Sequence, residues 1–293
     1  TGANNTAIGY ATLGANTTAS NNVAVGYNAL NDNTTADSNT AVGANALATN
    51  TTGTLNNAFG VNSLDANTTG NTNVAMGYAA LGSNTTASAN VAIGHDAMVA
   101  NTTGANNTAV GFQALDANTT GTYNTAVGWS ALSANTTANA NTAVGESALI
   151  NNTTGASNTA VGQSALNANT TGTPNVAVGF EAMKANTTGA SNTALGANAL
   201  TANTTAANNV AVGYSAGDSI TTSPNNTLVG FNAGSGMTTG IQNIGIGGNV
   251  MGGAAITGNF NVAIGQNAMY LLTTGQYNVG IGVHALDAMT TAS

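Results

Sequence analysis

The sequence predicts an all-β fold, a parallel β-solenoid (β-roll) of about seventeen 17-residue coils, from three observations. A five-residue phrase recurs through the 293 residues, typically Asn, a β-branched residue, Ala, an apolar residue and Gly. Its copies are 17 residues apart from Ala7 to Gly245, then 18 apart once, then 17 apart again. No segment has a sustained helical periodicity. A fixed period of this length is typical of one structural unit stacked on copies of itself.

Repeat positions are counted from the Ala of the phrase, which is position zero. The phrase is rich in β-branched and apolar residues and predicts a strand of about five residues. Position one is apolar in all seventeen copies, and position six is Leu or Met in fifteen. Positions one and six are therefore predicted to form the core. Positions three to six predict a second short strand, whose polar position four marks a solvent-facing side.

Two further positions do not vary at all. Position two is Gly in every copy, which predicts a positive φ or a close approach of another backbone. The Asn two residues before position zero is also constant, and two interpretations stay open: a ladder of stacked amides, or a turn that favours Asn. The predicted structural ladder is represented by Asn22, Gly26, Asn107, Gly111, Asn278 and Gly282.

The remainder of each coil is turn, and its Asn-Thr-Thr sequence satisfies the acceptor rule for N-linked glycans. Either these turns carry glycans, or they are polar turns that match a permissive pattern. The candidate glycan acceptors are Asn16, Asn33, Asn50, Asn67, Asn84, Asn101, Asn118, Asn135, Asn152, Asn169, Asn186 and Asn203. In the last five coils this Asn is replaced by Ile220, Met237, Ala254, Leu272 and Met289. The change predicts contact with another subunit, contact with a further rod, or a widened core.

The repeat is regular over residues 1–216 and again over residues 263–293. Between them, residues 217–262 contain several extra glycines and Pro224, and Gly replaces Leu at position six in Gly217 and Gly234. We expect a bend or joint there. Bare coil ends would expose unpaired strand edges, which predicts end-to-end stacking.

Composition excludes several function classes. Lys184 is the only basic residue beside nine carboxylates, which argues against binding to nucleic acid or to anionic membranes. The chain has no Cys, and no apolar run reaches the ~20 residues of a membrane span. These features fit an extracellular or cell-surface protein, or a virion fibre.

Catalytic and metal sites are not expected, and no cofactor is predicted. His95 and His284 are eleven repeats apart, and His95 with Asp96 is interpreted as a solvated surface pair. Every Ser lies in a turn or on the repeated surface, which leaves no Ser/His/Asp arrangement. Four Asp residues share position seven but lie at least three coils apart, roughly 14 Å or more. They are Asp65, Asp116, Asp218 and Asp287.

Position three carries most of the aromatic residues. The same column also accepts Ala44, Glu146 and Gln163, so it is predicted to be at least partly exposed. Exposed aromatics bind sugars or partner surfaces, or else they shield strands or line a groove between chains. The candidate surface-binding aromatics are Tyr10, Tyr27, Tyr78, Phe112, Trp129, Phe180, Tyr214 and Phe231.

The phrases Asn-Thr-Ala-Val-Gly-Tyr-x-Ala-Leu and Asn-Thr-Thr-Gly resemble known repeats. They are similar to head repeats of trimeric autotransporter adhesins and, more closely, to repeats of phage and bacterial tail-fibre-domain proteins. The resemblance implies a left-handed β-roll, trimer formation and a surface location. The 17-residue coil is longer than the usual adhesin-head coil. The strict Ala and Gly columns are what close approach between chains would require, so a homotrimer is favoured over a single-chain solenoid.

The sequence therefore predicts a structural protein, a segment of an extracellular fibre or filament that presents a repetitive surface. Its expected partner is itself, as a homotrimer, an end-to-end polymer or both. Alternatives are an adhesin or tail-fibre shaft that binds a cell-surface glycan or receptor, and an ice-binding solenoid. Adjacent Thr residues on an extended chain point to opposite sides, so Asn-Thr-Thr would give one aligned Thr row. An enzyme is not expected.

Overall fold

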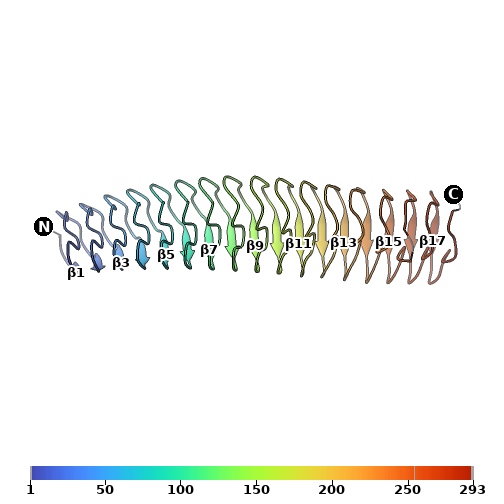
Figure 1. Cartoon of the computed structure of the whole chain (residues 1–293), viewed down its shortest axis with the longest axis horizontal. Helices are drawn as coiled ribbons and strands as arrows, with labels where there is room; N and C mark the ends of the chain where they lie inside the picture. The colour runs from blue at the N-terminus through green and yellow to red at the C-terminus, as the bar shows by residue number, and fades with distance from the viewer. Residues whose placement is uncertain (1, 254, 292–293) are drawn as a thin grey trace. The chain divides into compact units, whose positions relative to one another are not determined.

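The computed structural model describes residues 2–253 and 255–291. These residues form no helix and seventeen strands, one for each coil. The chain divides into two compact units, Thr1–Glu146 and Ser147–Ser293. Within each unit, successive coils stack through parallel strands (Figure 1). The predicted all-β parallel solenoid is therefore confirmed for each unit.

In the first unit each strand pairs with the next strand along the chain. Each strand residue lies opposite the residue 17 positions later, as Ala24 lies opposite Ala41. Its strands are β1 (Thr6–Ile8), β2 (Val23–Val25), β3 (Thr40–Val42), β4 (Asn57–Phe59), β5 (Val74–Met76), β6 (Val91–Ile93), β7 (Thr108–Val110), β8 (Thr125–Val127) and β9 (Thr142–Val144).

The second unit repeats the arrangement. Its strands are β10 (Thr159–Val161), β11 (Val176–Val178), β12 (Thr193–Leu195), β13 (Val210–Val212), β14 (Thr227–Val229), β15 (Ile244–Ile246), β16 (Val262–Ile264) and β17 (Val279–Ile281). Gly245 of β15 lies opposite Ala263 of β16, so the single 18-residue interval leaves the strand register intact.

Each coil has one strand of three residues, and the predicted five-residue strand with a second strand at positions three to six is wrong. The reason is backbone conformation. Asn28 at position four has φ of 57° and Leu30 at position six has φ of 52°. This left-handed conformation interrupts an extended chain, so positions three to six form consecutive turns.

The core is made by positions zero, five and six. Ala24, Ala29 and Leu30 are fully buried, as are their equivalents in most coils. Position six is thus confirmed as core, whereas the prediction for position one is wrong. Successive side chains of a strand point to opposite faces, so the inward Ala24 forces Val23 and Val25 outward.

The small residues pack within one chain. Gly26 has φ of 134°, and a Cβ added to it would lie 2.5 Å from the carbonyl oxygen of Gly43 in the next coil. Gly111 and Gly282, at the same position, also have positive φ. The Ala and Gly columns are used inside a single chain, so they do not by themselves indicate close approach between chains, and the homotrimer stays a prediction.

The constant Asn residues form the predicted ladder. The backbone N–H of Asn39 donates to Oδ1 of Asn22 at 2.8 Å, and Nδ2 of Asn39 donates to the carbonyl of Gly53 at 2.9 Å. The same bond to the preceding Asn is made by Asn107 at 2.9 Å and by Asn278 at 3.0 Å. Each of these Asn residues thus bonds to the Asn of the preceding coil through its backbone N–H and to a turn carbonyl through its side-chain amide.

A second ladder is formed by the Asn of Asn-Thr-Thr. Nδ2 of Asn50 donates to Oδ1 of Asn33 at 3.0 Å and to the carbonyl of Gly53 at 2.9 Å. That carbonyl therefore accepts from both ladders, since Asn39 also donates to it. Two columns of buried amides and the turn between them form one hydrogen-bonded network.

In the irregular residues 217–262, a small residue at one core position is matched by a larger residue at another. Gly217 and Gly234 replace Leu in the left-handed position six, with φ of 61° and 65°. In the same region Leu228 replaces Ala at position zero and is fully buried. A Cβ on Gly234 would lie 2.6 Å from both methyl carbons of Leu228, so this side chain fills the vacated space. The strands keep their parallel register through the region, and a bend there stays a prediction.

Three of the five residues that replace the second Asn column lie in the core, and Met289 in the last coil is partly exposed. Ile220, Met237 and Leu272 are fully buried, which agrees with the interpretation of a widened core. Ala254 lies outside the described residues. Ile256 is also fully buried and forms a parallel bridge with Met237, so Ile256 continues the apolar column in that coil.

We expect Asn67→Ala to lower the free energy of unfolding by about 3 kcal/mol, because it leaves buried partners without hydrogen bonds. Asn67 donates to Asn50 and Gly70 and accepts from Asn84. Chemical denaturation followed by circular dichroism measures the change. The matched control is Thr69→Ala at an exposed site of the same turn, and an equal loss in both variants would contradict the role of the ladder.

We expect Leu228→Ala to cost about 2–5 kcal/mol, because it opens a cavity beside two glycines. Gly234→Leu alone overpacks the same space. The double variant Leu228→Ala with Gly234→Leu restores the regular pattern and should recover most of the lost stability. Thermal unfolding of the three variants tests this, and additive losses in the double variant would show that the volumes are not exchanged.

Candidate interaction face

The outward side of each strand carries no charge. The apolar sheet face is defined as the first and third residues of the strands, which flank the buried central residue. Its third-residue column is apolar in every described strand, and its first-residue column holds Thr, Val, Ile and one Asn. Phe59 and Met76 are 39% and 43% exposed in the first unit, and Ile246 is 40% exposed in the second. Exposed apolar side chains in a row are a candidate interaction site.

All eight predicted surface aromatics are exposed, with Tyr10 at 75% and Phe112 at 43% as the extremes. Several stack on the aromatic residue of the next coil. Tyr10 and Tyr27 have ring centroids 5.6 Å apart, and Tyr214 and Phe231 have centroids 5.7 Å apart. Such stacking covers part of each ring face and leaves the edges in solvent.

One stacked pair was missed by sequence reasoning. Phe260 and Tyr277 stack with ring centroids 5.0 Å apart and planes inclined by 1°. They lie three residues before position zero, outside the aromatic column. The 17-residue spacing of these two aromatics could have predicted the stack, because equivalent residues of adjacent coils lie side by side.

His95 lies in the longest of these stacks. Its ring is 5.0 Å from that of Tyr78 and 5.5 Å from that of Phe112. Nδ1 of His95 is 3.0 Å from Oδ2 of Asp96 at the surface. The two residues form the surface pair that the sequence indicates.

The candidate glycan acceptors lie inside the fold. The side chains of all except Asn16 are fully buried, and Asn16 is partly exposed. In the second unit, Nδ2 of Asn169 donates to Asn152 at 2.8 Å and to Gly172 at 3.2 Å. A glycan on that nitrogen would displace these bonds. The folded chain therefore does not support the glycan interpretation, and the pattern matches a polar turn.

The two threonines of the turn have different roles. The Thr102 hydroxyl donates to the carbonyl of Thr119 at 3.0 Å, and its equivalents do the same along each unit. The following threonine, such as Thr103, is exposed. The turn thus presents one exposed Thr row, as the alternation of side chains predicts.

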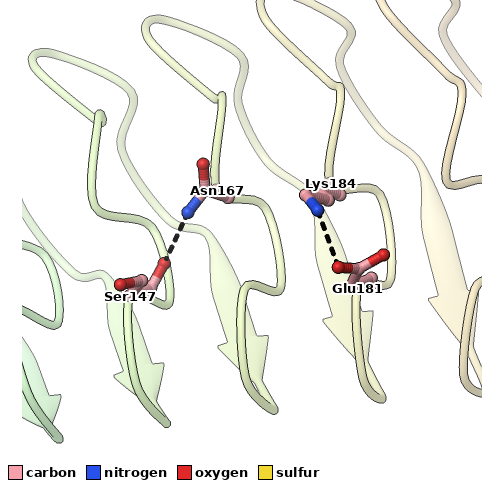
Figure 2. Close-up of polar contacts among 4 residues, drawn as sticks. All are labelled: Ser147, Asn167, Glu181 and Lys184. Carbon is pink, nitrogen blue, oxygen red and sulfur yellow. Dashed lines mark hydrogen bonds and ion pairs between the residues drawn. The ribbon is translucent and has the colours of Figure 1, made fainter.

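Polar and charged residues gather at the corner between positions four and seven. In the second unit, Nζ of Lys184 is 2.6 Å from Oε1 of Glu181, and Nδ2 of Asn167 donates to the carbonyl of Ser147 at 3.3 Å (Figure 2). Among the described residues, no three His, Cys, Asp or Glu side chains lie close enough to hold one metal ion.

Three carboxyl groups at this corner are half-buried. Burial raises the pKa of Asp65, Asp116 and Asp218 above the ordinary value of 3.8, because the charged form loses water. For Asp116, the nearby charge of Asp96 raises the pKa further. Asp287, at the same repeat position, instead places Oδ2 2.8 Å from Nδ1 of His284.

No protein family and no curated protein sequence matches this chain. Over residues 2–253 and 255–291, no helix has the length and apolar character of a membrane span. The resemblance to adhesin-head and tail-fibre repeats therefore stays a prediction from the sequence.

We expect Asp116→Asn to raise the thermal midpoint at neutral pH. The raised pKa means that the protonated carboxyl favours the folded state; this contribution is complete below about pH 3.8 and is lost as pH rises through the folded pKa. Asn stays neutral, so its advantage should disappear on acidification. Thermal unfolding at several pH values measures it. Exposed Asp32→Asn is the control, and an advantage that persists at acid pH would contradict the desolvation argument.

Proposed function

We propose that the chain is a structural segment of an extracellular or virion fibre, whose copies associate laterally through the apolar sheet face as a homotrimer. One observation carries the proposal: the third-residue column of the strands is always apolar although it points away from the chain's own core. A column that contributes nothing to the interior could be polar, so its constant apolar character favours a surface that a partner covers.

The repeat itself favours a second copy of the chain as the covering partner. The face presents similar side chains at the parallel strand spacing of ~4.8 Å, coil after coil. A partner that matches it along its length needs the same axial repeat, which another copy has by construction. Closed symmetric association is the usual way in which identical chains cover such a surface.

A repetitive, sparsely charged chain without Cys suits a mechanical role outside the cell. Its backbone is occupied by coil-to-coil hydrogen bonds, which limits access by proteases. The chain has few charged residues, and they favour no reaction chemistry. The proposed role is therefore to span distance and to present a repeated surface. End-to-end polymerisation is proposed as a second mode of assembly.

Two other functions have an observation in their favour. The exposed indole of Trp129, at 51%, favours a receptor- or glycan-binding shaft, because aromatic side chains supply much of the energy of such contacts. The single exposed Thr row favours ice binding less, because one row gives only a narrow ordered surface. The apolar sheet face extends through more coils than the exposed aromatics and remains the stronger basis.

We expect the full chain to sediment as a trimer at micromolar concentration and the double variant Met76→Lys with Val110→Lys to sediment as a monomer. Both side chains lie on the apolar sheet face, where a buried charge is costly. The control variant Thr69→Lys with Thr103→Lys alters exposed turn residues and should remain a trimer. Analytical ultracentrifugation, with circular dichroism to check folding, measures this. A monomeric wild type would overturn the proposal.

A further inference from the structure

A pocket of about 520 Å³ opens at the corner between positions four and seven in the last coils of the second unit. Its volume is within the range of small-molecule sites. It is lined by Asn249, Asn267, Tyr270, Leu271, His284 and Asp287, together with Ala288. In earlier coils of this unit the same corner holds short polar contacts such as Lys184 with Glu181 (Figure 2).

The pocket exists because two bulky side chains occupy positions that are small or polar in most coils. Tyr270 at position seven and Leu271 at position eight are 38% and 43% exposed. The equivalent residues of the preceding coil are Gly252 and Gly253. A side chain on Gly253 would overlap the Tyr270 ring, so this glycine makes room for the ring.

The polar groups of the pocket are already held in place. Nδ1 of His284 is 2.8 Å from Oδ2 of Asp287, and its Nε2 is 3.5 Å from Nδ2 of Asn267. The backbone N–H groups of Asn267 and His284 are fixed by bonds to the preceding coil, at 3.0 Å and 2.9 Å. Each amide offers both a donor and an acceptor, so the pocket combines paired hydrogen-bonding groups with an aromatic and an aliphatic surface.

We propose that this pocket binds a neutral saccharide of one or two rings. A sugar ring carries hydroxyl groups for the amides and the His284–Asp287 pair, and C–H groups for the faces of Tyr270 and Leu271. Anionic sugars are disfavoured, because Asp287 is a carboxylate and the chain's one basic residue, Lys184, does not line the pocket. The inference is independent of assembly through the apolar sheet face.

The test is saturation-transfer NMR on the full wild-type chain with methyl β-galactoside, methyl α-mannoside and N-acetylglucosamine, followed by titration with the best binder. We expect the signals of Asn267 and His284 to shift on binding. Tyr270→Ala and Asn267→Ala should each weaken affinity at least about tenfold, which corresponds to loss of one aromatic or paired polar contact.

Tyr277→Ala is the matched control, because Tyr277 is an exposed aromatic of the same unit outside the pocket and outside the aromatic column at position three. It should bind the sugar as the wild type does. Three results would overturn the proposal. The first is an equal loss of affinity in this control, and the second is no shift of the Asn267 or His284 signals with any of the three sugars. The third is preferential binding of N-acetylneuraminic acid. Sedimentation of the same variants separates this outcome from a failure of assembly, because none of them alters the apolar sheet face.

Discussion

Buried asparagine amides set the distance and the register between coils, and the remainder of the fold depends on them. Each coil has only three strand residues, too few for strand pairing alone to fix a 17-residue loop. Backbone bonds between turns, such as Leu30 N–H to the carbonyl of Ala46 at 3.0 Å, extend the pairing beyond the strands. The Asn22 and Asn33 columns add buried side-chain bonds to it, because each amide binds its own turn or the turn of the next coil as well as the equivalent amide. An unsatisfied amide in this interior would be costly, so every copy has to be Asn or be replaced together with its neighbours.

That replacement is seen where the second ladder stops. Oδ1 of Asn203 has no hydrogen-bond partner, because the next residue in its column is Ile220. Beyond it the column continues as the buried apolar side chains of Ile220, Met237 and Ile256. The same repacking includes Gly217 and Gly234, which replace Leu at position six, and Leu228, which replaces Ala at position zero. The fold therefore accepts two interiors, one polar and one apolar, provided that each is internally consistent.

The same narrow interior decides what the surface presents. An Ala at position zero is the only strand residue that points inward, so the larger apolar residues on either side are directed outward. The core fixes the direction of these residues, whereas their uncharged character along the strands is a property of the sequence. The proposed lateral assembly makes use of the apolar sheet face, and the pocket at Tyr270 arises at a different corner from a local departure in the repeat.

The sequence alone determined the architecture, because a fixed period with constant Asn and Gly can be satisfied only by coils that stack in register. It also predicted the burial of Leu30 and its equivalents, and for the Gly column a positive φ or a close backbone approach, both of which Gly26 has. Only the tertiary structure decided that Val25 points outward and Ala24 inward, because an apolar column is equally consistent with a core or with an interface. It likewise decided that Asn50 is buried, since an acceptor motif records residue types and not which side of a turn faces the interior. Periodicity fixes which residues are equivalent, whereas the left-handed turns at positions four and six fix the direction in which each of them points.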